Sequence, residues 1–327
     1  MNLRIRRRRF GQIAIASAAF SAIANFAGKT VAQQAESTIY GVSFPSSADI
    51  INIGINKITE LIDVNITPAL TLISSDLVSG KDVLTQLPGI SVNNRDTLVE
   101  TANKALYTEP SERLTALTPL AGGSFVIVSV ASTRTGNFNR IILIDRNSAR
   151  PQRALRVSGF RRINGTLESL VAIKENSFIG VVSLNEGTPP FDLVNFDFNS
   201  AKLNSSNDLP LLPGNLRLSN LTLSPDGTIY ATALSSQGST TLVQLDLENK
   251  AIVSGRGKII TLLELKYNNK PLENDLLSLA VAKSGQVFAL ANPTFEKINS
   301  LFSVDLKSGE MKLLRKFPAD KIAFARA

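Results

Sequence analysis

The 327-residue sequence predicts an all-β protein assembled from repeated four-stranded sheets. Three observations predict this class: a strand that ends in an aspartate recurs along the chain, a hairpin recurs ahead of it, and the two ends of the chain carry complementary parts of one repeat. Internal repeats of about 40–50 residues are typical of architectures in which each repeat forms one supersecondary unit.

The first repeat is an alternating strand that runs into an aspartate and a polar turn. It occurs as RIILIDRNSA, DLVNFDFNSA, TLVQLDLENK and SLFSVDLKSGE, which place the aspartate at Asp145, Asp197, Asp246 and Asp305. The aspartates lie 52, 49 and 59 positions apart, a spacing that fits one four-stranded unit. An aspartate at the start of a tight turn accepts hydrogen bonds from backbone N–H groups further along the turn. We therefore interpret these four residues as turn residues, in preference to a ring of metal ligands or general acids.

The second repeat is a hairpin that precedes each aspartate strand. SNLTLSPDGTIYATAL (219–234) and LSLAVAKSGQVFALA (277–291) show it best, 114–130 and 167–184 repeat it, and 87–102 matches more loosely. Alternating strands around a Gly-containing turn are typical of a β-hairpin. Outer strands follow as ALRVSGF, KIITLLELKY and MKLLRKF. The predicted order in each unit is hairpin, aspartate strand, outer strand.

These units resemble the blades of a β-propeller, and the LSPDGTIYA segment is similar to blades of the broad YVTN, gluconolactonase-like and WD40-like group. The resemblance covers most of residues 38–327. It implies the fold and little more, because propellers of this group have unrelated functions.

The chain ends predict how the ring closes. KIAFARA (321–327) aligns with SLAVAKS, and STIYGVSF (37–44) resembles GTIYATAL, so each end supplies a strand that the other lacks. We expect Ile322 to Ala325 to pair beside Ile39 to Phe44. With Gly54 of INIGINK at the aspartate position of the first blade, 91 positions separate it from Asp145, which predicts six blades. Residues 66–86 are expected to form a loop or short helix, and five or seven blades remain open.

The N-terminus resembles a twin-arginine (Tat) export signal. Arg7, Arg8 and Phe10 fit its two-arginine pattern, ahead of an apolar stretch from Ile13 to Ala27, and we expect cleavage after Ala32. This divides the chain into a signal peptide (1–32) and one propeller domain (33–327). A mitochondrial presequence and a basic tail are the alternatives. The apolar stretch is shorter than the ~20 residues of a spanning helix, so no stable membrane span is expected. The Tat translocon is the expected export partner. The expected destination is the periplasm, a thylakoid-type lumen or the cell exterior.

Composition removes several classes of chemistry. Residues 1–32 hold six of the 35 basic residues and none of the 27 acidic ones, so the remaining chain is nearly neutral, and no nucleic-acid binding is expected. The chain has no Cys and no His, which excludes disulfides, thiolate nucleophiles and Ser-His-Asp triads. Catalysis would need carboxylates, lysine, tyrosine or a hard cation bound by oxygen.

The candidate site lies where the innermost strands begin, because these positions converge on one mouth of the central channel. The residues there are Arg113, Glu168, Asn220, Asp275 and Asp320, with Glu112, Asn274 and Lys321 beside them. They would bind a ligand or a cation with oxygen ligands. Polar loop ends are also typical of propellers without a site.

Two functions follow. The gluconolactonase-like resemblance implies a hydrolase with Ca²⁺ or another hard divalent cation held by Glu168 and Asn220, although Ala282 stands where that family carries an aspartate. The sequence favours a non-catalytic, extracytoplasmic module that binds an unidentified protein or small ligand, with Phe138, Phe191 and Phe295 as loop residues that either contact a partner or pack inward. We expect Glu168→Ala and Asn220→Ala to leave folding nearly intact.

Overall fold

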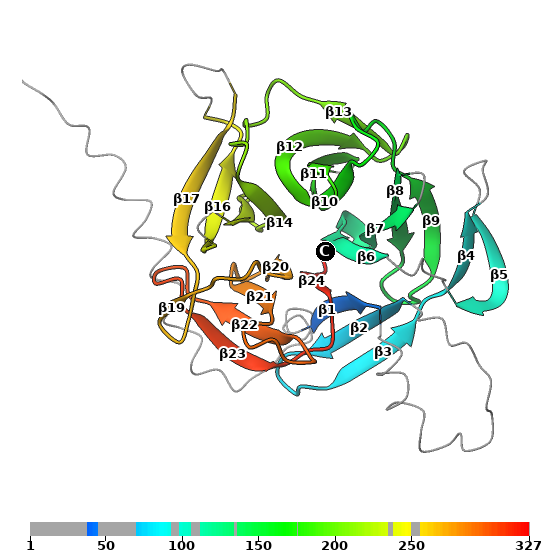
Figure 1. Ribbon diagram of the computed structural model, residues 1–327. Helices are drawn as coiled ribbons and strands as arrows, with labels where there is room; N and C mark the ends of the chain where they lie inside the picture. The colour runs from blue at the N-terminus through cyan, green and yellow to red at the C-terminus, as the bar shows by residue number, and fades with distance from the viewer. Residues whose placement is uncertain are drawn as a thin grey trace, which may run out of the picture. The chain divides into compact units, whose positions relative to one another are not determined.

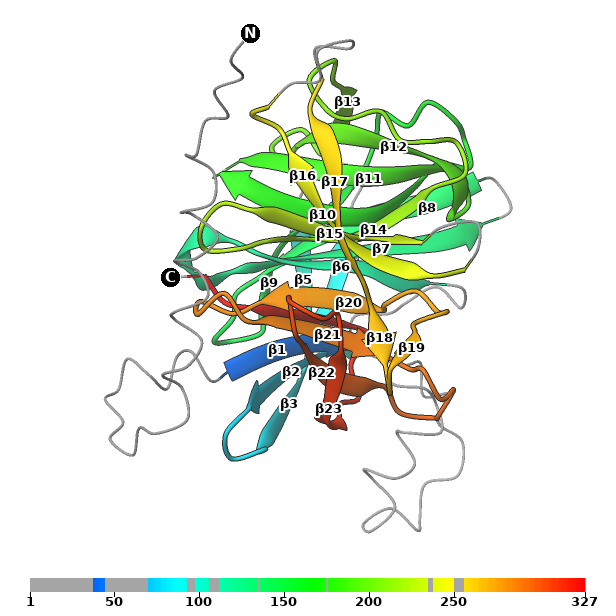
Figure 2. The same cartoon turned by 90° about the vertical axis from the view of Figure 1, so that its left-hand side faces the viewer.

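In the computed structural model, the described residues form five four-stranded antiparallel sheets arranged in a ring, whose centre we call the channel (Figure 1). The structure describes residues 38–44, 70–92, 98–105, 112–133, 136–174, 176–234, 238–249 and 256–326, with the backbone alone for 88–92, 98–105, 132, 133 and 136. The sheets are the blades of a β-propeller, as the sequence predicts, and Figure 2 shows them from the side. The predicted signal residues Arg7, Arg8 and Phe10 and the cleavage position after Ala32 lie outside the described residues.

The strands of each blade follow one another from the channel outward, innermost strand first. Blade 1 contains β24 (Lys321–Phe324), β1 (Thr38–Ser43), β2 (Thr71–Asp76) and β3 (Asp82–Gln86). Blade 2 contains β6 (Arg113–Pro119), β7 (Phe125–Thr133), β8 (Gly136–Ile144) and β9 (Pro151–Arg156). Blade 3 contains β10 (Thr166–Lys174), β11 (Ser177–Asn185), β12 (Thr188–Asp197) and β13 (Lys202–Ser205). Blade 4 contains β14 (Arg217–Leu223), β15 (Ile229–Leu234), β16 (Thr240–Asp246) and β17 (Lys258–Glu264). Blade 5 contains β20 (Ser278–Val281), β21 (Val287–Ala291), β22 (Ser300–Val304) and β23 (Met311–Lys316).

Smaller elements connect the blades. The pairs β4 (Pro88–Val92) with β5 (Leu98–Ala105), and β18 (Lys266–Tyr267) with β19 (Lys270–Pro271), form two-stranded sheets. A short 3-10 helix, Ala121–Gly123, joins β6 to β7. Across the described ranges, we find no helix whose length and hydrophobicity would let it cross a bilayer.

The ring closes through the two ends of the chain. β24 pairs antiparallel with β1, with Ile39 opposite Phe324 and Gly41 opposite Ile322. Ile39, Ile322 and Phe324 are buried in one cluster. The predicted closure is therefore confirmed. The pairing covers the inner edge of β1, so that in the described blades only short edges remain.

The described residues form five blades, a count that the sequence left open beside the favoured six. β2 and β3 occupy residues 71–86, which were expected to form a loop or short helix. The aspartate of blade 1 is Asp76, because it ends β2 and opens the turn to β3, while Gly54 lies outside the described residues. The chain between Asp76 and Asp145 holds one blade and the β4–β5 hairpin, which Figure 1 shows outside the ring next to β9.

The repeated aspartates make the predicted turns. The backbone N–H groups of Val78, Asn147, Asn199, Asn249 and Lys307 donate to Asp76, Asp145, Asp197, Asp246 and Asp305 at 2.7–3.2 Å. Each aspartate opens the turn that leads to the outermost strand of its blade. These carboxylates therefore accept hydrogen bonds within their own turns, which lie at the end of the blades opposite the predicted mouth.

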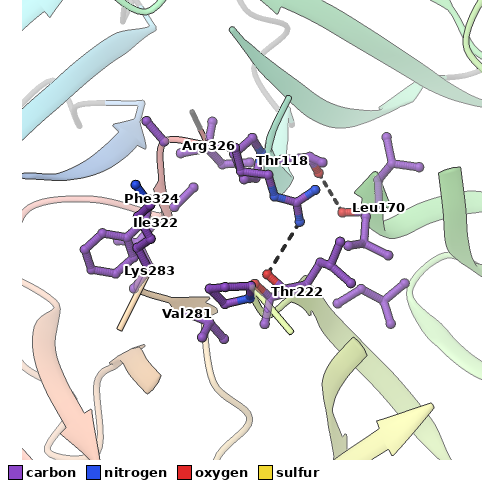
Figure 3. Close-up of a pocket in the computed structure, with 16 residues that line it drawn as sticks. Thr118, Leu170, Thr222, Val281, Lys283, Ile322, Phe324 and Arg326 are labelled. Atoms are coloured by element: carbon purple, nitrogen blue, oxygen red, sulfur yellow. Dashed lines mark hydrogen bonds between the residues drawn. The ribbon is translucent and has the colours of Figure 1, made fainter. Parts of the chain in front are cut away.

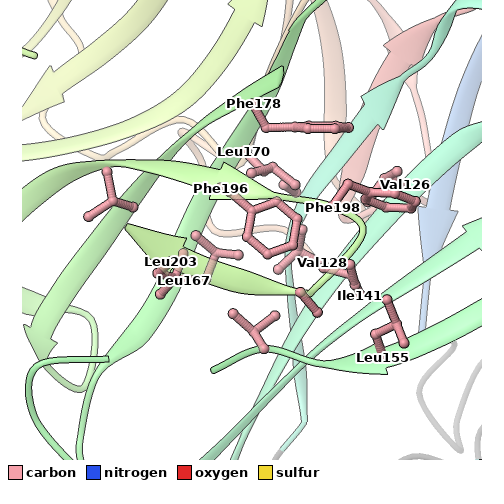
Figure 4. Close-up of a cluster of buried hydrophobic side chains, with 14 of the residues drawn as sticks. Val126, Val128, Ile141, Leu155, Leu167, Leu170, Phe178, Phe196, Phe198 and Leu203 are labelled. Carbon is pink, nitrogen blue, oxygen red and sulfur yellow. The ribbon is translucent and has the colours of Figure 1, made fainter. Parts of the chain in front are cut away.

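The hydrophobic core lies between neighbouring blades. One cluster joins Val126, Val128 and Ile141 of blade 2 to Phe178 and Phe196 of blade 3 (Figure 4). Phe178 also stacks on Phe198 with ring centroids 5.4 Å apart. Burial of one large apolar side chain contributes about 1.5–3 kcal/mol to stability. The packing of neighbouring blades is therefore stabilised mainly by these apolar contacts.

Blade 4 and blade 5 also approach through their backbones. Gly309 has a positive φ of 77°, and a Cβ at this position would overlap the carbonyl oxygen of Glu264. The N–H of Lys266 donates to the Gly309 carbonyl at 2.9 Å. Only glycine combines this backbone conformation with such a close approach.

Candidate functional site

The innermost strands hold their first residues at one end of the channel, which we call the mouth. The hydroxyl of Thr115 on β6 donates to the Leu167 carbonyl on β10 at 2.7 Å. The N–H of Leu221 on β14 donates to the Ser169 hydroxyl on β10 at 2.8 Å. The N–H of Ile322 on β24 donates to the Ser278 hydroxyl on β20 at 3.0 Å. Corresponding positions of these strands therefore lie at similar heights along the channel.

Arg113 and Glu168 form a two-pronged ion pair between blades 2 and 3. Arg113 Nη1 lies 2.8 Å from Glu168 Oε2, and Nη2 lies 2.5 Å from Oε1. Glu168 is buried, with 5% of its side chain exposed, whereas the Arg113 side chain is 45% exposed. Burial by itself would raise the pKa of Glu168, but the hydrogen bonds and charge of Arg113, with the Thr166 hydroxyl, bring it below its ordinary value. The Glu168 carboxylate is thus ionised, and both of its oxygens accept hydrogen bonds from Arg113.

A second pair forms between blades 4 and 5. Arg217 Nε lies 3.3 Å from Asp275 Oδ2, and the Ser219 hydroxyl donates to the same oxygen at 3.0 Å. The Arg217 side chain is 40% exposed and that of Asp275 is 14% exposed. Burial raises the pKa of Asp275, against the opposing charge of Arg217. The charge of Arg217 also lowers the pKa of Glu168, which places this guanidinium near both carboxylates.

Lys321, the first residue of β24, completes the set of charges at the mouth. Its ammonium donates to the Leu277 carbonyl. Burial lowers the pKa of Lys321 to about 8, against the charges of Asp275, Glu168 and Asp320. The mouth therefore combines three cations and two buried carboxylates on neighbouring innermost strands, with Asp320 preceding β24.

Two of the predicted site residues serve the ring itself. Asp320 accepts the Phe44 N–H at 3.0 Å and so fixes the closing blade, and burial raises its pKa. Asn220 is buried with a positive φ of 55°, and its amide donates to the Leu276 carbonyl at 2.8 Å and to the Thr232 hydroxyl at 2.9 Å. Both side chains are held by backbone groups of the neighbouring segment. The expectation that Glu168→Ala or Asn220→Ala leaves folding nearly intact conflicts with this burial, since each change would leave polar partners unpaired.

Arg217 is a mouth residue that the sequence-based prediction omits. The sequence does contain a signal for Arg217: it is the first residue of β14, just as Arg113 is the first residue of β6.

The residues expected beside the site have other roles. Glu112 receives two hydrogen bonds from buried Arg140, at 2.7 and 2.9 Å, and lies within blade 2.

The donor set at the mouth does not fit a divalent cation as it is folded. Both oxygens of Glu168 accept hydrogen bonds from Arg113, which a metal ion would have to displace. Within the described part of the chain, no group of three or more carboxylates is placed to hold a metal ion. A cation held by oxygen needs several such ligands free of competing cations.

The opposite end of the channel holds a cavity of about 240 Å³, which we call the far pocket. It lies where the same five innermost strands end, and its walls are mainly aliphatic, including Leu117, Leu170, Leu221, Val281 and Ile322. Figure 3 shows the Arg326 side chain extending across the opening between Thr118 and Thr222. The sequence patterns predict a site at the mouth and none at this end.

The three phenylalanines predicted in or beside loops differ in position: Phe138 lies on β8, Phe191 on β12 and Phe295 in the loop between β21 and β22. Phe191 is buried, and Phe138 is half-buried with its ring centroid 5.3 Å from the Arg156 guanidinium carbon. Phe295 is 81% exposed and has a positive φ of 53°. Its loop is ordered by Asn292, which accepts the Glu296 N–H at 2.7 Å.

Comparison with known proteins assigns this chain to no family. No family model and no curated protein matches the chain. Similar solved structures include the calcium-binding protein regucalcin from Agrobacterium tumefaciens strain C58, at 13% identity over 61% of this chain and 56% of that one, with a TM-score of 0.34. An oligogalacturonate lyase in complex with manganese is 7% identical over 76% of this chain and 62% of its own, with a TM-score of 0.35. A protein from Lactobacillus plantarum is 11% identical over 89% and 99%, with a TM-score of 0.43. Matches this distant carry no activity over to this chain.

Proposed function

We propose that this protein is exported and acts outside the cytoplasm as a non-catalytic binding module that recognises an acidic protein segment at its mouth. The observation that carries the proposal is the asymmetry of exposure within the ion pairs: Glu168 and Asp275 are 5% and 14% exposed, while Arg113 and Arg217 are 45% and 40% exposed. The mouth therefore presents guanidinium groups to solvent and keeps its carboxylates beneath them.

Each exposed guanidinium retains donors for a partner. A guanidinium has five N–H donors in a planar fork. Glu168 takes two from Arg113, and the ion pair with Asp275 engages Nε of Arg217. The carboxylates hold the forks in place, so an acidic side chain would meet groups that are already oriented.

Phe295 supplies the second element of the proposed surface. Its loop joins β21 to β22, so it lies at the same end of blade 5 as the start of β20. Aromatic residues and arginines are the residue types that contribute most to the energetics of protein interfaces. A partner with an acidic centre and an apolar flank would engage both features.

Binding of a fluorescent deca-glutamate peptide tests the proposal. We expect saturable binding by the mature protein, weakening with added salt, and a loss of about tenfold or more in affinity for Arg217→Gln because a charge-assisted hydrogen bond contributes about 1.5–3 kcal/mol. Arg150→Gln, which removes an exposed cation from an Asp145-type turn, is the matched control and should bind as wild type. Equal binding by wild type and Arg217→Gln would contradict the proposal.

The competing hypothesis is a hydrolase that uses a divalent cation at Glu168 and Asn220. In the same preparations, calcium would then raise the melting temperature of wild type but not of Glu168→Gln or Asn220→Ala. That result, with turnover of a lactone substrate, would replace the binding proposal. Export is tested separately: the double change Arg7→Lys and Arg8→Lys should retain the full-length precursor in the cytoplasm.

A further inference from the structure

The far pocket contains a cation for which the described residues supply no acidic partner. Arg326, two residues after β24, donates from Nη1 to the Ala172 carbonyl at 2.9 Å and from Nη2 to the Leu223 carbonyl at 3.5 Å. These carbonyls belong to blades 3 and 4, so the side chain crosses the channel from blade 1. No carboxylate among the described residues forms an ion pair with it, in contrast to Arg113 and Arg217 at the mouth.

The surroundings make an unpaired charge costly. The walls include Leu170, Leu221, Val281 and Ile322, all of which are hydrophobic. Burial is the cause that lowers the pKa of Arg326, and no charge of the described residues opposes it. A guanidinium stays protonated in proteins, so this end of the channel carries a fixed positive charge. Buried charges are normally paired, because their desolvation is otherwise uncompensated.

The size and lining of the cavity limit the ligand that would complete this pairing. A volume of about 240 Å³ corresponds to roughly eight water-sized groups at about 30 Å³ each. The cavity offers one partly buried cation within it, and exposed Lys283 lines it as well. Thr118 is already committed, since its hydroxyl donates to the Leu170 carbonyl at 2.6 Å. A ligand of this size would therefore be mostly apolar and would carry a single anionic end.

We propose that the far pocket is a binding site for a small amphipathic carboxylic acid, whose carboxylate pairs with Arg326 and whose apolar body lies against Leu170, Leu221, Val281 and Ile322. Two of the five N–H donors of Arg326 are used by carbonyls, so donors remain for the carboxylate. Lys283 is a second, solvent-exposed cation that lines the same pocket. This site is separate from the mouth and goes beyond the proposed function there.

The test compares a carboxylate with its neutral amide. Hexanoate and hexanamide share the same apolar chain, so the difference between them isolates the charge. We expect saturable binding of hexanoate to the mature protein by isothermal titration calorimetry, with at least about tenfold weaker binding of hexanamide, as expected for a charge-assisted hydrogen bond. Methyl NMR of Leu221 and Val281 should show hexanoate-dependent shifts.

Variants separate this site from the mouth. Arg326→Gln should weaken hexanoate binding about tenfold or more while leaving deca-glutamate binding at the mouth unchanged. Arg217→Gln should have the reverse effect, and the exposed Arg150→Gln should affect neither ligand. The circular dichroism spectrum and melting profile of Arg326→Gln, compared with those of wild type, would test whether the ring remains closed in this variant.

Three results would overturn the proposal. The first is equal affinity for hexanoate and hexanamide. The second is unchanged hexanoate binding in folded Arg326→Gln. The third is no detectable binding of hexanoate, benzoate or phenylacetate to wild type. None of these results depends on whether the mouth binds acidic peptides.

Discussion

The two ends of one channel use their charges in opposite ways. At the mouth, the Arg113 guanidinium lies 2.8 and 2.5 Å from the oxygens of Glu168, and Arg217 faces Asp275 at 3.3 Å. At the far pocket, Arg326 contacts carbonyl oxygens and aliphatic walls. The same five strands build both ends, so the difference comes from which residues begin and end each strand. At the mouth, carboxylates hold the guanidinium groups in place, whereas at the far pocket no described carboxylate pairs with Arg326.

Removal of residues 321–326 should have the largest effect, because it breaks both ends at once. The deletion takes away the strand that pairs with β1, together with buried Ile322 and Phe324. Large-to-small changes in a core cost about 2–5 kcal/mol each, so the loss approaches the entire 5–15 kcal/mol typical of a domain. We expect no cooperative unfolding transition in urea. A cooperative transition with the wild-type m-value would show that the ring closes without β24.

The Arg113–Glu168 pair should show the next largest effect. Arg113→Ala leaves a carboxylate that is 5% exposed without its cation, and we expect a loss of about 2 kcal/mol at pH 7, below the 3–5 kcal/mol of fully buried pairs because Arg113 is 45% exposed. Glu168→Gln should cost about 1 kcal/mol, since water solvates the remaining guanidinium.

A double-mutant cycle in urea measures the coupling between these two residues. The double variant should be more stable than the sum of the single losses implies. Because Glu168 has a lowered pKa in the folded protein, its stabilisation is present above its unfolded pKa and is lost as the pH falls through the folded value. The deficit of Arg113→Ala should accordingly shrink toward pH 4. Strict additivity at pH 7 would mean that the pair makes no net contribution.

Lys321 provides a pH test of the mouth. Its pKa is lowered to about 8 by burial, so between pH 8 and its ordinary value of 10.5 the unfolded chain binds more protons than the folded one. The free energy of unfolding should therefore rise with pH in this window, by about 1 kcal/mol between pH 8 and 9.5. Lys321→Met should remove the rise, as measured by urea denaturation at matched ionic strength. A flat wild-type profile would place Lys321 in better contact with water than the structure indicates.

The aspartate turns should show the smallest effect. Asp197 accepts the Asn199 N–H at 2.9 Å in an exposed turn at the far end of blade 3. Asp197→Ala should lower the free energy of unfolding by less than any of the changes above, because water competes for the hydrogen bonds of an exposed turn. Neither hexanoate nor deca-glutamate binding should change. A loss of either ligand in this folded variant would give the repeated aspartates a role beyond the turn.

The difference between six predicted blades and five observed ones shows what a repeat pattern leaves out. DLVSGK at Asp76 closely matches DLKSGE at Asp305, which is a usable sequence signal for the turn of blade 1. The spacing is misleading, because the β4–β5 hairpin lengthens the interval to Asp145 and imitates a further blade. A hairpin pattern specifies local pairing and does not reveal which sheet, if any, the hairpin joins.

The candidate residues at the mouth were predictable in position but not in role. The sequence placed Arg113, Glu168 and Asp275 at the starts of innermost strands, and the structure brings them to one end of the channel with Arg217 and Lys321. It could not indicate that Asn220 and Asp320 would bond to backbone groups of neighbouring segments. Those partners lie 56 and 276 positions away along the chain.

The sequence by itself determined most of the strands, apart from β2 and β3, and four of the five aspartate turns, because strand alternation and turn chemistry act between residues that are close in the chain. Ring closure was also accessible, since two incomplete repeats can be matched by their patterns. Only the tertiary structure decided which cations form an ion pair with a carboxylate and which, like Arg326, lie among aliphatic side chains. That outcome depends on how five strands from distant parts of the chain align around the channel, and no local pattern encodes their relative heights or the space left between them.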